Sequence, residues 1–463
     1  MSSRSRKSPA CENCRRRRIK CNQLRPRCSQ CARAGLSCSG YREPIDLLFQ
    51  DQTATVARKF RKDPNLAAAE PETDCFCVLT SPASSASSSL TLVNPTTYVE
   101  QIAWKYFFTN FNITRNTPVA IPEPWLTSST CGLGSVTSVG LAAMAIIRQD
   151  PHMMELARRK YSAALRHLAQ AVQDPHEVTQ GPTTTTSFNM SIFEMIISDG
   201  PDTAYEWLKH IRGTTALMRV VRFSTSNAIF AVKGCLQVCF TIAVASLISG
   251  TLVPPYVMDV INAFPRTEIY AEVSPIIELF SLLSRLVNLY ILAKQTGNHS
   301  PRDFTSALTE IDHDLVSWTT RLPPVWTGDP STGSRLMDGQ ATNWLPRLWG
   351  YYRLCRVITH QVILDNAHRS PAKRELSLEI ISRMSHEIYA SIPSMLRKPA
   401  LGACTGVCLG LTSDVFFLVT ILQALLKVTD KQTVLDEWAV SANETMGKEE
   451  FGPVRGFVER HLC

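Results

Sequence analysis

The chain has 463 residues, of which 44% are hydrophobic and 19% are charged. This is a globular composition, and the length exceeds that of one ordinary domain and suffices for a large buried core. The net charge of +8 is uneven, because residues 1–62 hold 16 Lys and Arg against 4 Asp and Glu, whereas the remainder holds 32 against 36. We therefore expect a basic arm that binds a polyanion, followed by a nearly neutral body.

A basic tail, residues 1–10, opens the chain without the apolar run that a secretory signal requires. We therefore expect the protein to stay in a reducing compartment. Regularly spaced cysteines there usually bind metal rather than form disulfides. Six of the 15 cysteines lie close together after this tail, and the other nine are scattered.

The six clustered cysteines form an internal repeat with a period of 17 residues. They are spaced Cys11-x2-Cys14-x6-Cys21-x6-Cys28-x2-Cys31-x6-Cys38. Zinc in structural sites takes four ligands in a tetrahedron, and thiolates are among the preferred ones. No histidine precedes His152, so two zinc ions can be completed only if two of the six thiolates are shared. The repeat predicts that the shared pair is equivalent in the two halves, but the spacing does not choose the pair.

Two alternatives to a structural metal site are disfavoured. Disulfides are disfavoured by the absence of a signal, and unrelated cysteines are disfavoured by the two matched C-x2-C-x6-C units. A metal-storage protein would be mostly cysteine and would lack the large apolar body. A structural metal site with no position open for water is the reading that we retain.

The segment from Cys11 to Tyr41 resembles the binuclear zinc cluster (Zn2Cys6) of fungal transcription factors, which implies a DNA-binding domain at residues 11–41. In that family the first and fourth cysteines bridge the metals, which here means Cys11 and Cys28. Pro26 matches the proline that turns the loop between the halves. Asn22 departs from the family, which more often has Asp after the third cysteine. Two short, metal-held helices are expected, one in each half.

The two halves differ in charge, with "RRRRIK" in the first six-residue gap and "ARAGLS" in the second. Only the first helix is therefore built to face a polyanion. The resemblance implies that Arg17 and Arg18 read bases, usually in a CGG triplet, and we assign Arg15 and Lys20 to phosphate. Arg or Lys paired with guanine is the commonest specific contact in the major groove. The alternative is a solvated run or a nuclear import signal without base reading.

Residues 42–62 are predicted to be a linker that contains a short amphipathic helix. Its apolar residues fall near one helical face: Ile45, Leu48, Phe49, Val56 and Phe60. The family often dimerises at this place, but the segment is short for a zipper, and packing against the body is an equal alternative. Residues 63–97 are rich in Ser, Pro and Ala and are predicted to be a disordered linker.

The remainder, residues 98–463, is predicted to be one all-α regulatory domain. Two segments show apolar stripes at helical spacing. The first stripe comprises Leu156, Tyr161, Ala164, Leu165, Leu168 and Val172, and the second comprises Trp207, Leu208, Ile211, Leu217 and Val220. The pattern diffusely resembles the helical regulatory domain that follows the zinc cluster in fungal factors.

Two uncharged or nearly uncharged stretches, 234–253 and 404–426, are long enough to span a bilayer. Polar residues dilute the first, and Asp414 would be costly inside a membrane, so we interpret both as buried core helices and expect no membrane contact. The Cys235/Cys239 and Cys404/Cys408 pairs have apolar neighbours and are read as core residues rather than ligands.

No complete catalytic motif is present, so we expect no enzyme. "HEIYA" at 386–390 lacks the second histidine of a zincin, and "GLGSVT" at 132–137 lacks the last glycine of a dinucleotide fingerprint. The sequence predicts a nuclear protein that binds double-stranded DNA at GC-rich half-sites of the CGG type and acts with the RNA polymerase II machinery. Its expected cofactors are two structural zinc ions. A homodimer is one arrangement that it allows. The alternative is a zinc-stabilised protein-interaction module that reads no sequence.

Overall fold

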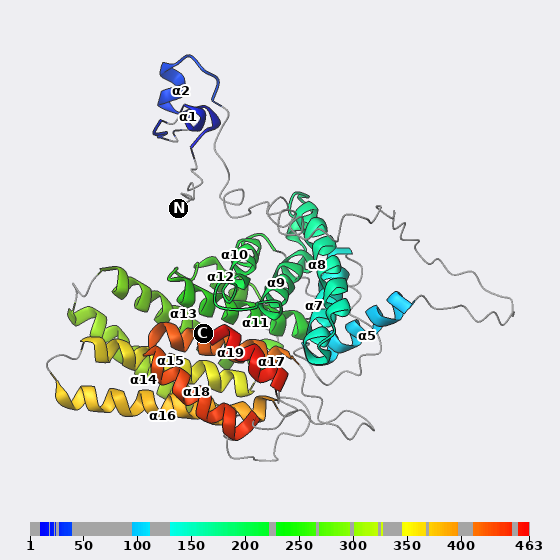
Figure 1. Ribbon diagram of the computed structural model, residues 1–463. Coiled ribbons are helices and arrows are strands. Elements are labelled where there is room, and N and C mark those ends of the chain that lie inside the picture. Colours follow the sequence, from blue (N-terminus) through cyan, green and yellow to red (C-terminus); the bar gives the residue numbers. More distant parts are fainter. Residues whose placement is uncertain are drawn as a thin grey trace. The chain divides into compact units, whose positions relative to one another are not determined.

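The computed structural model describes residues 10–17, 19–22, 24, 27–38, 95–111, 130–221, 228–264, 268–296, 301–322, 326, 345–366, 370–396, 411–446 and 452–462. The chain divides into two units, Met1–Tyr98 and Val99–Cys463. Within the described ranges every regular element is a helix, as Figure 1 shows. A small cysteine-rich domain followed by a large helical domain was predicted and is confirmed.

The first unit contains two five-residue helices, α1 (Glu12–Arg16) and α2 (Ser29–Arg33). Cys28 caps the N-terminus of α2: its sulfur accepts a hydrogen bond from the backbone N–H of Cys31 at 3.3 Å. Helix α2 ends where Gly35 adopts a φ of 63°, and the N–H of Leu36 then reaches the Cys31 carbonyl at 3.0 Å. Helices this short are not stable alone, so tertiary ties must hold them.

The second unit is a stack of helices. Its elements are α5 (Pro95–Asn110), α7 (Thr130–Arg148), α8 (Pro151–Ala171), η2 (Glu177–Thr179), α9 (Gly181–Ile196), α10 (Trp207–Met218), α11 (Ala228–Ser249), α12 (Tyr256–Asn262), α13 (Glu268–Thr296), α14 (Pro301–Arg321), α15 (Leu345–Asn366), α16 (Pro371–Leu396), α17 (Ser413–Val428), α18 (Lys431–Met446) and α19 (Gly452–Leu462). Helices α7 and α8 form an antiparallel pair, and α14, α15 and α16 pack in sequence (Figure 1). Helix α5 begins at Pro95, inside the end of the predicted 63–97 linker, because proline suits the first helical position.

The core of the second unit centres on α11 and α17, which pack against each other. Both helices are apolar on nearly all sides where described, as expected for helices surrounded by others. The predicted stripe of α8 is largely confirmed: Tyr161, Ala164 and Leu168 are buried, while its other residues are half-buried at the edges. In the second stripe Val220 is half-buried and lies beyond the end of α10.

The two long apolar stretches of the sequence contribute to these central helices. Within 234–253, the residues of α11 are mostly buried in the core. Of 404–426, residues 404–410 lie outside the described ranges. Helix α17 begins only at Ser413, and Asp414 lies in its first turn, 2.7 Å from the Arg347 guanidinium. The ion pair with Arg347 explains how the Asp414 carboxylate is accommodated at the start of an otherwise apolar helix.

One helix in the described part of the chain is long and apolar enough to cross a membrane. It is Val273–Gln295 of α13, with a mean hydropathy of 1.7, and 61% of its most apolar window is buried within the protein. Neither of the apolar stretches noted from the sequence, 234–253 and 404–426, lies within this segment. The core helix of a soluble protein has the same length and composition, so this feature alone is weak evidence for a membrane.

Candidate metal centre and nucleic-acid interface

All six predicted ligand cysteines are described, and none of them forms a disulfide. Cys11, Cys14, Cys28 and Cys31 are buried, whereas Cys21 and Cys38 are half-buried. The Sγ atom of Cys28 lies 3.7 Å from that of Cys11 and 3.6 Å from that of Cys14. These separations are far longer than the roughly 2.05 Å of a disulfide.

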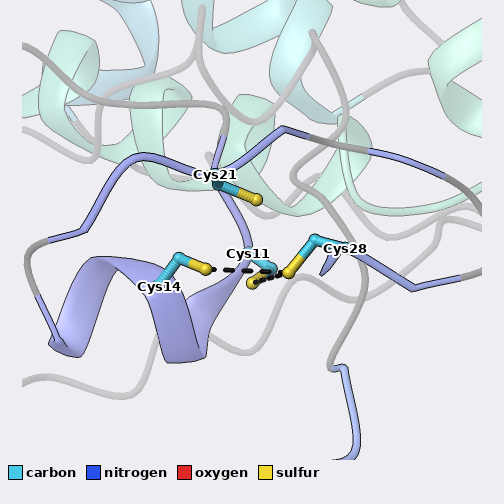
Figure 2. Close-up of side chains that lie close together, drawn as sticks. All are labelled: Cys11, Cys14, Cys21 and Cys28. Carbon is cyan, nitrogen blue, oxygen red and sulfur yellow. Dashed lines mark hydrogen bonds between the residues drawn. The ribbon is translucent and has the colours of Figure 1, made fainter. Parts of the chain in front are cut away.

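The sulfur atoms fall into two groups of four. One group is Cys11, Cys14, Cys21 and Cys28, and the other is Cys11, Cys28, Cys31 and Cys38; within each group all sulfurs lie within 4.8 Å of one another. Figure 2 shows the first group, with the sulfurs of Cys11, Cys14 and Cys28 close together and Cys21 on the segment that passes beside them. Cys11 and Cys28 belong to both groups.

The dimensions of these groups fit zinc. A Zn–S bond of about 2.3 Å in a tetrahedron places neighbouring sulfurs about 3.8 Å apart. The Cys11–Cys28, Cys11–Cys31 and Cys14–Cys28 separations are 3.7, 3.7 and 3.6 Å. Six sulfurs in two overlapping tetrahedra supply eight positions, which is the number that two zinc ions need.

The electrostatics of the centre differ from one thiol to another. Burial raises the pKa of Cys14 to about 11, and it also raises the pKa values of Cys11 and Cys31. The pKa of Cys28 is instead lowered to about 6, chiefly by the hydrogen bond from the backbone N–H of Cys31. Three buried thiols therefore hold their protons at neutral pH without a metal, and a bound cation must displace those protons.

Of the four predicted DNA-contacting residues, Arg17 and Lys20 are described with their side chains, and both are exposed. Arg15 lies within α1, but its side chain is outside the described part, and Arg18 is outside it altogether. Arg16, for which we predicted no role of its own, is also exposed on α1. The described basic side chains of this segment thus face solvent, as contact with a polyanion requires.

Two side chains that the sequence analysis gave no role tie the halves of the repeat together. The Asn13 amide donates to the Ser37 carbonyl at 2.8 Å and approaches the Cys31 sulfur at 3.7 Å. The Asn22 side-chain oxygen accepts the backbone N–H of Ser29 at 3.1 Å. No signal in the sequence marks these contacts, because an amide beside a ligand has many partners within reach.

The helical unit also holds a cluster of titratable groups between α8, α9 and α10. The Tyr161 hydroxyl donates to Glu194 at 2.5 Å and lies 3.0 Å from the His210 ring nitrogen. His210 lowers the pKa of Glu194 against the effect of burial, which would raise it.

Cys235 and Cys239, with sulfurs 3.9 Å apart, are buried in α11. In the described ranges, groups with metal-ligand geometry occur only in the clustered cysteines.

Comparison with protein families gives two matches. The model of the fungal Zn(2)-Cys(6) binuclear cluster domain, a domain that binds two zinc ions, matches residues 9–47. The model of the fungal-specific transcription factor domain matches residues 97–401, about two thirds of the chain. Comparison with curated proteins and with solved structures gave no match.

Proposed function

The chain belongs to the fungal-specific transcription factors that carry a Zn(2)-Cys(6) cluster, and we propose that it reads GC-rich half-sites of the CGG type to regulate transcription by RNA polymerase II. Its families are those of DNA-binding transcription regulators and not of enzymes. The nucleus is the compartment where such a protein acts. The helical unit would then supply the regulatory contacts.

One observation carries the proposal: the cysteines form two overlapping groups of four sulfurs, and a run of four arginines directly follows one of them, Cys14, in the sequence. We assign Cys11, Cys14, Cys21, Cys28, Cys31 and Cys38 as the ligands of two zinc ions. Cys11 and Cys28 are assigned as the bridges because they alone belong to both groups. The metals have a structural role, since protein thiolates fill every position.

The arginine run is assigned to DNA. Arg17 and Arg18 are the proposed base-reading residues, and Arg15 and Lys20 are the proposed phosphate contacts. The exposed positions of Arg17 and Lys20 support these roles. A guanidinium that binds guanine O6 and N7 adds about 1–3 kcal/mol of discrimination against the wrong base.

The test is selection from random duplex DNA with the zinc-loaded full chain at near-physiological salt, with the chelator-treated chain as control. We expect enrichment of CGG-type triplets with zinc and none without it. The spacing and orientation of enriched triplets would reveal whether a homodimer binds. Binding that enriches no sequence and only weakens with salt would overturn base reading and leave a zinc-stabilised interaction module.

A further inference from the structure

The Asn13 side chain connects the helix that carries the arginine run to the opposite half of the repeat. It lies on α1, directly before the ligand Cys14. Its side-chain amide crosses to the second half and donates to the Ser37 carbonyl at 2.8 Å. Ser37 is adjacent to Cys38, so the amide anchors α1 to the chain that carries the last ligand.

The backbone of Asn13 continues this connection toward the DNA-contacting residues. The N–H of Arg17 donates to the Asn13 carbonyl at 3.1 Å. Residues three and four positions apart share a helix face, so Arg16 and Arg17 follow Asn13 on the same side. Hydrogen bonds therefore run from Arg17 through Asn13 to the second half of the metal centre.

The same amide also approaches a metal-ligand sulfur. Asn13 Nδ2 lies 3.7 Å from Cys31 Sγ, within reach of a weak N–H···S hydrogen bond. Cys31 belongs only to the second group of sulfurs, whereas Cys14, the neighbour of Asn13, belongs only to the first. Partners of this kind orient metal ligands and tune their charge.

We propose that Asn13 is a positioning residue that sets the direction of the arginine run relative to the second half of the metal centre. This inference rests on the proposed function, because a fixed direction matters only to a protein that reads bases. Helix α1 has five residues and cannot fix its own orientation. The shared sulfur of Cys11 fixes the chain directly before α1. The Asn13 side chain fixes the helix face on which Arg17 follows.

Asn22 provides a matched control. Its side chain makes one hydrogen bond between the halves, to the Ser29 N–H at 3.1 Å, and so resembles Asn13 in chemistry. It follows Cys21 and lies outside α1, so no hydrogen bond described here connects it to Arg17. Asn13→Ala and Asn22→Ala therefore each remove a tie between the halves, but only the first loosens the arginine run.

The experiment compares both variants with the parent as zinc-loaded full chains. Zinc per chain is measured, together with affinity for the selected DNA and for a scrambled duplex at one salt concentration. For Asn13→Ala we expect two zinc ions, unchanged affinity for the scrambled duplex and about fivefold weaker specific binding, the equivalent of about 1 kcal/mol. For Asn22→Ala we expect an unchanged ratio of the two affinities. Equal ratios in all three proteins would overturn the proposal.

A second readout separates this proposal from the proposed function. Hydrogen exchange of the Arg17 backbone amide reports the closure of α1 without any DNA. We expect faster exchange there in Asn13→Ala than in Asn22→Ala. If the parent selects no sequence, base reading fails, and unchanged exchange at Arg17 would separately overturn the positioning role.

Discussion

At the residue scale, Cys28 combines two tasks that usually fall to different side chains. Its sulfur accepts the Cys31 N–H and so caps α2, and the same sulfur belongs to both groups of four. The cap stabilises negative charge on the sulfur, which is the form that a bridging ligand needs. If Cys28 bridges as proposed, loss of this one atom would remove a ligand from each metal as well as the cap from α2.

This double role predicts unequal effects of replacing single cysteines. Cys28→Ala should abolish tight binding of both zinc ions, whereas Cys38→Ala should leave the group of Cys11, Cys14, Cys21 and Cys28 complete and retain one. Metal analysis after exhaustive dialysis would measure the zinc content. Retention of two zinc ions by the Cys28 variant would show that the bridge has been assigned to the wrong residue.

The gathering of the six cysteines could be predicted from the sequence, because thiolates at fixed spacing have few uses in a reducing compartment. The spacing did not identify the shared pair; the resemblance named Cys11 and Cys28, and the sulfur positions support that pair. Asn13 could not be predicted in the same way. Its contact depends on where Ser37 lies in space, 24 residues along the chain.

At the element scale, a buried ionic contact joins the start of α17 to α15 and α11. Arg347 is 2% exposed and donates to Asp414 at 2.7 and 3.0 Å and to Gln237 at 2.9 Å. The neighbouring Ser413 hydroxyl donates to the Asn110 carbonyl of α5 at 3.2 Å. Four helices thus meet at one polar group inside an apolar core.

Removing one partner of this contact should be costly. We expect Arg347→Met to lower the free energy of unfolding by about 3–5 kcal/mol, because it leaves the Asp414 carboxylate without its cation. Urea unfolding followed by circular dichroism would measure the loss. The double variant Arg347→Met/Asp414→Asn should recover part of it, and a double variant less stable than the single one would contradict this account.

Helices were easier to predict than their ends. The stripe of α8 is visible because its buried residues recur at helical spacing, and Asp150 caps its start by accepting the Met153 N–H. The 404–426 stretch was read as one apolar element, although α17 begins only at Ser413. The partner of Asp414 lies on α15, far away in sequence, so the local pattern could not reveal it.

At the scale of the whole molecule, two separate sets of buried residues stabilise the two units. One set surrounds the clustered cysteines, and the other comprises the apolar core of the helical stack. The first is too small to fold on apolar burial alone, whereas the second is large. The clustered cysteines and the apolar remainder of the sequence predicted this division. The packing partners of each helix could not be predicted, because they depend on contacts between residues far apart in the sequence.

Zinc removal should therefore affect the units unequally. We expect a chelator to abolish DNA binding while most of the helical circular dichroism signal and its thermal transition persist. The measurement is a thermal scan of the full chain with and without chelator, followed by zinc re-addition. Loss of the main transition on chelation would show that the helical unit depends on the metals.

The helical unit should also lose stability on mild acidification. His461 is 1% exposed, and burial lowers its pKa below the ordinary value of about 6.5. The unfolded chain therefore takes up the proton first, so this contribution is present above pH 6.5 and is lost as the pH falls below it. Unfolding measured between pH 7.5 and 5.5 should show a shallower decline in His461→Gln than in the parent, and identical slopes would exclude this role.

Helix α19 has a consequence for the order in which the protein forms during synthesis. Gln423 in α17 accepts the Trp207 indole N–H at 3.2 Å and donates to the carbonyls of Ala204 and His461 at 3.1 and 3.4 Å. Helix α19 leaves the ribosome after every other described helix. Until it does, the hydrogen bond from Gln423 to the His461 carbonyl cannot form, and the face of α17 that packs against α19 stays exposed. The zinc unit can mature long before, so a nascent chain would hold a finished DNA-contacting end while its core still needs protection from aggregation.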